Sequence, residues 1–263
     1  MVDTAVAFDD ASAYEDFMAR WSRAIGIDFL DWLAPPSGSK WLEIGCGTGV
    51  FTKLLLERCS PSPVAAVDSA PAQIELARTQ LGQQQVDISV CDAQRLPFAD
   101  ASFDIVASAL VINFIPDRSR ALAEMSRVCR PGGRVTGYVW DFAGERSAGW
   151  PLRHGFCRIG LDPPPIPGSD DTSEESLYRL FVSTGLEQVA LRSIDVTMTF
   201  ASFDDYWRSQ TPPFAPQGKM VAALTGRDRK RLAEAVRAAL PSPELTGSIT
   251  YAARAHAIEG RRS

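Results

Sequence analysis

The sequence is poor in the side chains that most often bind transition metals. Of its 263 residues only two are histidine, His154 and His256, and they stand far apart. The five cysteines form no C-x-x-C pair: Cys46, Cys59, Cys91, Cys129 and Cys157. We therefore expect no metal site, and we expect the scattered thiols to be reduced, as in a cytoplasmic protein.

Long apolar runs and an excess of basic charge are also missing. No stretch of about 18 apolar residues suits a membrane span, and early acids at Asp3, Asp9 and Asp10 argue against a signal peptide. The 27 basic residues are outnumbered by 32 acidic ones, which gives a formal net charge of -5. A general nucleic-acid binder carries a basic face, so neither a membrane nor a nucleic acid is an expected partner.

Length and apolar content allow a full hydrophobic core. Hydrophobic residues make up 45% of the chain, an ordinary share for a globular protein. A chain of this length forms one large α/β domain with an insertion, or two small domains. The oligomeric state is left open between a monomer and a homodimer.

The most informative segment runs from Lys40 to Lys53 and reads Lys-Trp-Leu-Glu-Ile-Gly-Cys-Gly-Thr-Gly-Val-Phe-Thr-Lys. Its first apolar residues predict a buried parallel strand, and residues 45–49 predict a glycine loop. A helical run follows and ends near Cys59, before Ser60 and Pro61. Glycines in such a loop let a ligand approach the main chain, and they tolerate positive φ.

The spacing of the glycines distinguishes between cofactors. A dinucleotide fingerprint has the form G-x-G-x-x-G, whereas here the third glycine, Gly49, comes one residue early and Val50 takes its place. The acid Glu43 stands two residues before the first glycine. Val50 therefore argues against an NAD(P)-dependent oxidoreductase, which stays as a less favoured alternative beside a tight turn that binds no ligand.

Two acids follow predicted strands. The apolar run 64–67 ends at Asp68, and the alternating run 86–90 is followed by Asp92. The carboxyl ends of parallel strands face the ligand crevice, and an acid about 20 residues past the glycines is placed to accept hydrogen bonds from both ribose hydroxyls. Ser69 is the expected cap of the next helix, with Pro71 just inside it.

Four landmarks in order resemble the class I S-adenosylmethionine (SAM)-dependent methyltransferases. They are the Glu-x-Gly-x-Gly-x-Gly loop, Asp68, Asp92 and the Arg-Pro-Gly-Gly turn at 130–133, and their agreement with the predicted strand ends strengthens each of them. The resemblance covers about residues 38–140 and points to the ubiquinone-biosynthesis-like (methyltransferase type 11) branch.

The resemblance implies an α/β fold with a Rossmann-like, seven-stranded, mostly parallel sheet and helices on both faces. An N-terminal helical cover is expected at 1–36 and the SAM-binding core at 37–142. Residues 143–263 are expected to add a lid loop, a helix, the remaining strands and a helical insertion before the last strand, all in the same domain.

The resemblance also implies the cofactor contacts. Asp92 would accept a hydrogen bond from the adenine amino group with Ala93 against the ring, and Glu43 would face a cationic centre. The N-terminal helix either packs on the main domain with solvated arginines, which is the favoured interpretation, or covers the cofactor with Tyr14 or an arginine at the methionine carboxylate. Asn113 would lie near the sulfonium. The full expected set is Tyr14, Arg23, Glu43, Gly45, Cys46, Gly47, Gly49, Asp68, Ser69, Asp92, Ala93, Ala109 and Asn113.

The methyl acceptor is expected to be a small molecule. Enzymes that methylate nucleobase amino groups carry an Asn/Asp-Pro-Pro-Tyr/Phe loop, where this chain has Ser-Ala-Leu-Val at 108–111. Phe114, Trp140 and Trp150 are candidates for the acceptor pocket. An in-line transfer from an activated sulfonium needs alignment more than a base, so His154 is only a candidate general base and Asp141 a weaker one. A SAM- or S-adenosylhomocysteine-binding protein without transfer activity stays open as an alternative.

The rest of the chain predicts further elements. A helix over 11–33 has a possible break at Gly26. Residues 141–171, rich in Gly and Pro, predict a lid loop, and a Pro-rich turn is expected between the last two helices. The other expected elements are helices at 173–184, 202–210 and 227–240 and strands at 189–200 and 248–258.

Overall fold

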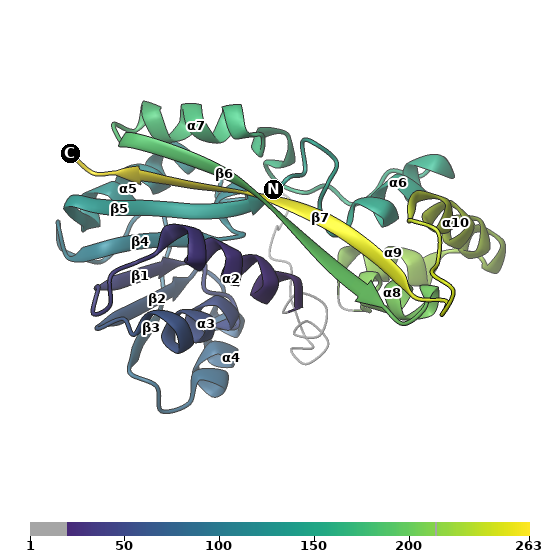
Figure 1. Ribbon diagram of the computed structural model, residues 1–263, viewed down its shortest axis with the longest axis horizontal. Coiled ribbons are helices and arrows are strands. Elements are labelled where there is room, and N and C mark those ends of the chain that lie inside the picture. Colours follow the sequence, from purple (N-terminus) through teal and green to yellow (C-terminus); the bar gives the residue numbers. More distant parts are fainter. Residues whose placement is uncertain (1–19, 214) are drawn as a thin grey trace.

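The computed structural model describes residues 20–213 and 215–263. Seven strands form one sheet in the order β3-β2-β1-β4-β5-β7-β6, in which β1 to β5 run parallel and β7 pairs antiparallel with both β5 and β6 (Figure 1). The strands are β1 (Trp41–Ile44), β2 (Val64–Asp68), β3 (Val86–Val90), β4 (Phe103–Ala109), β5 (Cys129–Trp140), β6 (Glu187–Phe200) and β7 (Ile249–Arg261). The expected fold class is confirmed.

Helices cover both faces of this sheet. Side chains of α2, α3 and α4 pack on one face, and those of α5 and α7 pack on the other. These helices are α2 (Arg20–Leu33), α3 (Val50–Cys59), α4 (Pro71–Leu81), α5 (Arg118–Val128) and α7 (Glu174–Ser183). Further from the sheet lie α6 (Trp150–Arg158), α8 (Phe203–Gln210), α9 (Pro216–Ala223), α10 (Gly226–Ala239) and the short 3-10 turns η2 (Ile112–Phe114) and η3 (Ser169–Asp171).

The register of the parallel strands brings four carboxyl ends to one edge. Ile44 at the end of β1 pairs with Val67 of β2 and with Ser108 of β4, and Asp68 of β2 pairs with Val90 of β3. The strand β1 is buried along its whole length because helices cover both of its faces. Loops that follow these strands therefore meet at one edge of the sheet.

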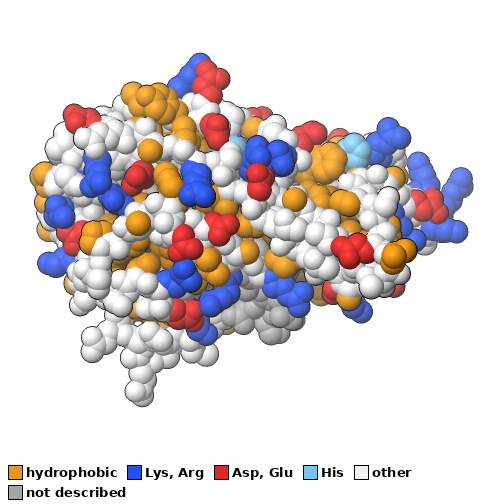
Figure 2. Space-filling view, viewed as in Figure 1, with side chains coloured by type: hydrophobic (Ala, Val, Ile, Leu, Met, Phe, Trp, Pro, Cys, Tyr) orange, Lys and Arg blue, Asp and Glu red, His pale blue; other side chains and the backbone are white. Residues whose placement is uncertain are grey.

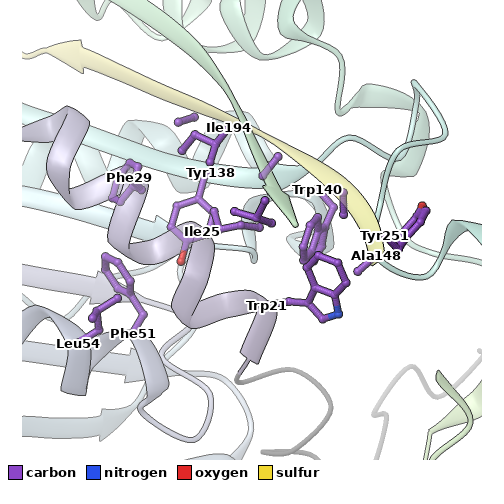
Figure 3. Close-up of a cluster of buried hydrophobic side chains, with 14 of the residues drawn as sticks. Trp21, Ile25, Phe29, Phe51, Leu54, Tyr138, Trp140, Ala148, Ile194 and Tyr251 are labelled. Atoms are coloured by element: carbon purple, nitrogen blue, oxygen red, sulfur yellow. The ribbon is translucent and has the colours of Figure 1, made fainter. Parts of the chain in front are cut away.

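The packing of α2 anchors the N-terminal side of the described chain (Figure 3). Trp21, Ile25 and Phe29 lie four residues apart and are all buried, so they form one apolar face of the helix. The ring centroids of Phe29 and Tyr138 are 4.8 Å apart, and those of Trp21 and Trp140 are 6.0 Å apart. The helix is thereby fixed on β5.

Gly26 does not break this helix, so the expected split is wrong. α2 is continuous from Arg20 to Leu33, and a Cβ at Gly26 would lie 2.7 Å from Leu54 Cδ2 on α3. The glycine is needed because α2 and α3 approach closely at this point. Residues before 20, including the predicted contact Tyr14, lie outside the described residues.

The segment 141–171 is only partly a loop. It contains the helix α6, which begins with Pro151 in its first turn, a position that proline tolerates well. Gly155 in the middle of α6 allows close contact with α10, since a Cβ there would lie 2.7 Å from Val236 Cγ2. The residues that predicted a loop therefore serve a helix start and a close helix crossing. The expected Pro-rich turn likewise contains α9, which Pro216 begins.

The last two strands form a long ladder that carries a helical cap. β6 and β7 pair from Glu187 opposite Arg261 to Phe200 opposite Ile249. The helices α8, α9 and α10 are inserted between the two strands at the end of this ladder, next to α6 (Figure 1). The predicted helical insertion before the last strand is confirmed. Within the described ranges, no helix is long and apolar enough to cross a membrane.

Candidate functional site

The glycine loop between β1 and α3 is tied to the end of the neighbouring strand. The amides of Gly45 and Cys46 donate to the Val67 carbonyl oxygen at 2.7 and 3.0 Å. Gly45 has φ +74°, and a Cβ there would lie 2.4 Å from Val111 Cγ1. Gly45 is therefore required for packing against the segment after β4, and its neighbour Cys46 is buried.

The other two glycines of the loop have different roles. Gly49 caps α3 in the left-handed conformation, and a Cβ there would contact Leu81 of α4 at 3.1 Å. Gly47 also has positive φ, +53°, but the nearest atom to a Cβ would be Gln73 Oε1 at 3.8 Å. Space beside the main chain is thus open at Gly47, where a ligand could approach the backbone.

Asp68 lies directly beside this open position. Its carboxylate accepts hydrogen bonds from the amides of Gly47 and Ala70, both at 2.9 Å. The predicted cap at Ser69 is wrong by one residue: Ala70 stands at the N-cap of α4 without a side-chain hydrogen bond, and Ser69 is exposed. The Asp68 carboxylate bonds the Ala70 amide instead, and this fixes its position at the loop.

Asp92 lies next along the same edge. The amide of Cys91 donates to the Asp68 carbonyl oxygen at 2.9 Å, which joins the ends of β2 and β3. The exposed Asp92 carboxylate accepts from the Gln94 amide at 2.9 Å and from the Gln94 side chain, and these bonds lower the pKa of Asp92. Asp92 is thus an ionised acceptor at the crevice, with the half-buried Ala93 beside it.

The Glu43 side chain is buried beneath the glycine loop and does not face a cationic centre as expected. It is 1% exposed, and it accepts a hydrogen bond from Thr52 Oγ1 at 2.6 Å. Burial raises the pKa of Glu43 to about 7, although the Thr52 hydrogen bond lowers it and the nearby Asp68 charge raises it further. Glu43 therefore connects β1 to the first turn of α3 beneath the loop.

This raised pKa predicts a pH-dependent stability. The folded protein holds the Glu43 proton more tightly than the unfolded chain, so its stabilising effect is complete below pH 4.5 and is lost as the pH rises through about 7. The unfolding free energy of Glu43→Gln minus that of the wild type should therefore rise by roughly 3 kcal/mol from pH 4.5 to pH 8. Chemical denaturation across this range measures the difference.

Glu124→Gln is a control variant, for which the stability difference from wild type should change with pH in the opposite direction. Hydrogen bonds from Arg127 lower the pKa of Glu124, which also accepts from the Leu96 amide. Its stabilising effect is therefore present above its ordinary pKa and is lost as the pH falls. A difference between Glu43→Gln and wild type that does not change with pH would contradict the assignment of a proton to Glu43.

The segment after β4 is held against the loop that follows α6. Asn113 Nδ2 donates to the Pro167 carbonyl oxygen at 3.0 Å, and a Cβ at Gly168 would lie 2.3 Å from the Asn113 carbonyl oxygen. The Asn113 amide group therefore binds this loop, so the structure does not support its predicted contact with the sulfonium. Ala109 ends β4 half-buried, and Phe114 is 48% exposed.

Several other predicted site residues lie elsewhere. Arg23 forms an ion pair at 3.0 Å with Glu57, which lies in the second half of α3 and not in the glycine loop. Trp140 is 6% exposed and packs edge-to-face on Trp21, so it belongs to the core and not to an acceptor pocket. Neither position supports the role expected from the sequence.

His154 and Trp150 both lie on α6, with ring centroids 4.8 Å apart. His154 lines a groove between α6 and α10 together with Arg158 and Arg231. No residue of the glycine loop takes part in this groove. The structure therefore gives no support to a catalytic role for His154, and it places Trp150 beside this groove.

Three of the buried polar atoms without partners belong to segments at the same edge of the sheet as the glycine loop. Thr48 Oγ1 in the loop, Gln73 Oε1 in the first turn of α4 and Ser108 Oγ near the end of β4 have no hydrogen-bond partner in the part of the chain that the structure describes. Unsatisfied buried groups are costly. Together with the space at Gly47 and the two acids, they fit a ligand with hydroxyl and amino groups, such as the adenosyl moiety of SAM.

Gln73 was missed in the sequence because a glutamine in a helix usually lies on the surface. The available signal was its place in the first turn of the helix that follows Asp68. His256 was missed for a similar reason. It is buried on β7, with Nδ1 2.9 Å from Ser193 Oγ and Nε2 3.4 Å from Asp141 Oδ1. It joins β6, β7 and the turn after β5.

The described residues contain no cluster of three or more His, Cys, Asp or Glu that could hold a metal ion.

Comparisons with known proteins agree with this geometry. Residues 42–136 match the family model described as "Methyltransferase domain". The chain is 33% identical over 168 residues to the ubiquinone/menaquinone biosynthesis C-methyltransferase UbiE of Desulfotalea psychrophila, covering 64% of this chain and 65% of that protein. It is 36% identical over 131 residues to a malonyl-[acyl-carrier protein] O-methyltransferase of Serratia marcescens, covering half of each.

The fold is also similar to a solved structure. The YcgJ protein of Bacillus subtilis aligns with a TM-score of 0.57 at 19% identity, covering 92% of this chain and 98% of that one. Residues 42–136 therefore form a methyltransferase domain, and the strand order and glycine loop are similar to those of the class I SAM-dependent methyltransferases. The similarity to UbiE points to the ubiquinone-biosynthesis-like branch of this class, and the cofactor is SAM. The chain spans less than two thirds of the length of either curated relative named above.

Proposed function

We propose that this protein transfers the methyl group of SAM to a small-molecule acceptor by direct in-line displacement. The observation that carries the proposal is the open main chain at Gly47 beside the Asp68 carboxylate, with Gln73 and Ser108 unpartnered around the same crevice. When bound, SAM supplies an already activated methyl group. The protein must then mainly position the two reactants and exclude water.

We assign the cofactor contacts to side chains at this edge of the sheet. Asp68 is proposed to accept from the ribose hydroxyls, and Asp92 is proposed to accept from the adenine amino group with Ala93 against the ring. Gln73, whose Oε1 has no partner among the described residues, is proposed to accept from a further donor of the same ligand. The ring of Phe114 in η2, 48% exposed, is on the proposed side from which the acceptor approaches.

The names of the relatives support a small-molecule acceptor but not a particular atom. One relative is named for C-methylation in quinone biosynthesis and the other for O-methylation of a malonyl group on a carrier protein. Both acceptors are small organic groups. The exposed aromatic ring of Phe114 suits an acceptor with an apolar part.

A turnover assay tests the proposal. The purified protein is incubated with SAM and a panel of quinol, phenol, carboxylate and amine acceptors, and S-adenosylhomocysteine formation is followed by mass spectrometry. We expect acceptor-dependent formation of S-adenosylhomocysteine that is absent in Gly47→Val. SAM binding without turnover on any acceptor would favour the binding protein without transfer activity, and stabilisation by NAD(P) but not by SAM would overturn the proposal.

A further inference from the structure

The helices α6 and α10 carry a charge opposite to that of the chain as a whole. Together they hold seven basic residues and only two acidic ones, Asp228 and Glu234, whereas the full chain has 27 basic and 32 acidic residues. Basic side chains gather at the end of the molecule where these helices lie (Figure 2). The basic residues are Arg153, Arg158, Arg227, Arg229, Lys230, Arg231 and Arg237.

A groove runs between these two helices on their outer side, and we call it the cap groove. Its volume is about 460 Å³, and it is lined by His154, Arg158, Ile159, Arg231, Glu234, Ala235, Ala238 and Ala239. The α10 side is formed by the small side chains of three alanines beside Arg231 and Glu234. Small side chains at a helix surface let another helix approach to about 8–10 Å between axes.

The inner faces of the two helices are already packed, so the groove is a fixed surface. Leu232 and Val236 are fully buried, and they contact α6 where Gly155 makes room for them. Some of the basic groups are engaged: Arg231 pairs with Asp228 at 3.1 Å, and Arg153 donates to the Pro164 carbonyl oxygen. Arg158, Arg227 and Lys230 are exposed, with no hydrogen bond or ion pair to another described residue.

We propose that the cap groove docks an acidic amphipathic helix of a partner protein. The small apolar residues of such a helix would lie on the alanines, and its flanking carboxylates would meet Arg158 and Arg231, as in helix-in-groove recognition. The acidic remainder of the chain would repel the same partner and so orient it toward the cap. A nucleic acid fits less well, because a long polyanion would also face that acidic remainder.

Fluorescence anisotropy with two labelled probes tests this inference. The probes are acyl carrier protein, used as an acidic helical protein, and a single-stranded RNA of about 20 nucleotides. The test variant is Arg158→Glu with Arg231→Glu. Its matched control is Arg179→Glu with Arg192→Glu, which makes the same charge change at exposed positions on α7 and β6, outside the cap.

We expect the wild-type protein and the control to bind acyl carrier protein with similar affinity, and the cap variant to bind it at least about tenfold more weakly. The affinity for SAM should stay within about twofold in both variants, so failure of this inference is separate from failure of the proposed function. Absence of binding by the wild-type protein, equal weakening in the control, or RNA binding stronger than that of the acidic protein would each overturn it.

Discussion

Gly47→Val is expected to abolish measurable SAM binding while the domain stays folded. The space beside Gly47 is open, with no atom closer than 3.8 Å to a Cβ position, and in the proposed complex the cofactor occupies that space. A branched side chain would block it. Isothermal titration calorimetry should show an affinity for SAM at least about 100-fold weaker, which corresponds to roughly 3 kcal/mol.

The backbone cost of this substitution needs a separate control. Gly47 has positive φ, so a valine there also costs about 1–2 kcal/mol of stability from local strain. Gly185 has φ +81° with no atom within 4 Å of a Cβ, and it lies between α7 and β6. Gly185→Val should therefore lose a similar amount of stability and keep full SAM affinity. Equal loss of SAM binding in both variants would show that strain, and not occupied space, explains the effect.

Asp68→Ala is expected to have the second large effect on SAM affinity. Hydrogen bonds to a charged group contribute about 1.5–3 kcal/mol each, and the proposed ribose contacts are two of them. The variant should therefore bind SAM about 100-fold to 10,000-fold more weakly in calorimetry. The loop amides of Gly47 and Ala70 also lose their acceptor, so a modest loss of stability is expected as well.

Asp117→Ala separates these two effects. Asp117 caps α5, and its carboxylate accepts from the Arg120 amide at 2.9 Å, so it shares with Asp68 the role of a backbone acceptor. It has no proposed contact with the cofactor. We expect Asp117→Ala to be destabilised by about 1 kcal/mol and to bind SAM as the wild type does. Unchanged SAM affinity in Asp68→Ala would remove Asp68 from the proposed site.

The sheet and the cofactor edge could be predicted from the sequence because local patterns determine them. Short apolar runs mark the parallel strands, and glycines or acids at their ends mark the loops. The helix expected at 173–184 is α7, and Ser173 caps it by accepting a hydrogen bond from the Ser176 amide. The Arg-Pro-Gly-Gly segment at 130–133, read as a turn in the sequence, lies within β5, which begins at Cys129 and has a register shift opposite 103–105.

Other features depend on distant parts of the chain and carry little local signal. Gly26 and Gly155 resemble helix breakers in the sequence, yet each serves a close contact with another helix. His154 resembles a candidate base, but the crossing of α6 and α10 places it in the cap groove. The acid Glu43 is buried because helices cover β1 on both faces. The position of each of these residues follows from packing between segments that the sequence pattern does not connect.

The antiparallel ladder of β6 and β7 carries the cap as an insertion between two directly paired strand ends. The chain leaves the ladder at Phe200 and returns at Ile249, directly opposite. A change of length within 201–248 therefore leaves the register of every strand unchanged, provided that α10 keeps its packing on α6. A single insertion within β6 would instead turn every later side chain to the other face of the sheet. Insertions and deletions are thus tolerated between β6 and β7 but not within either strand.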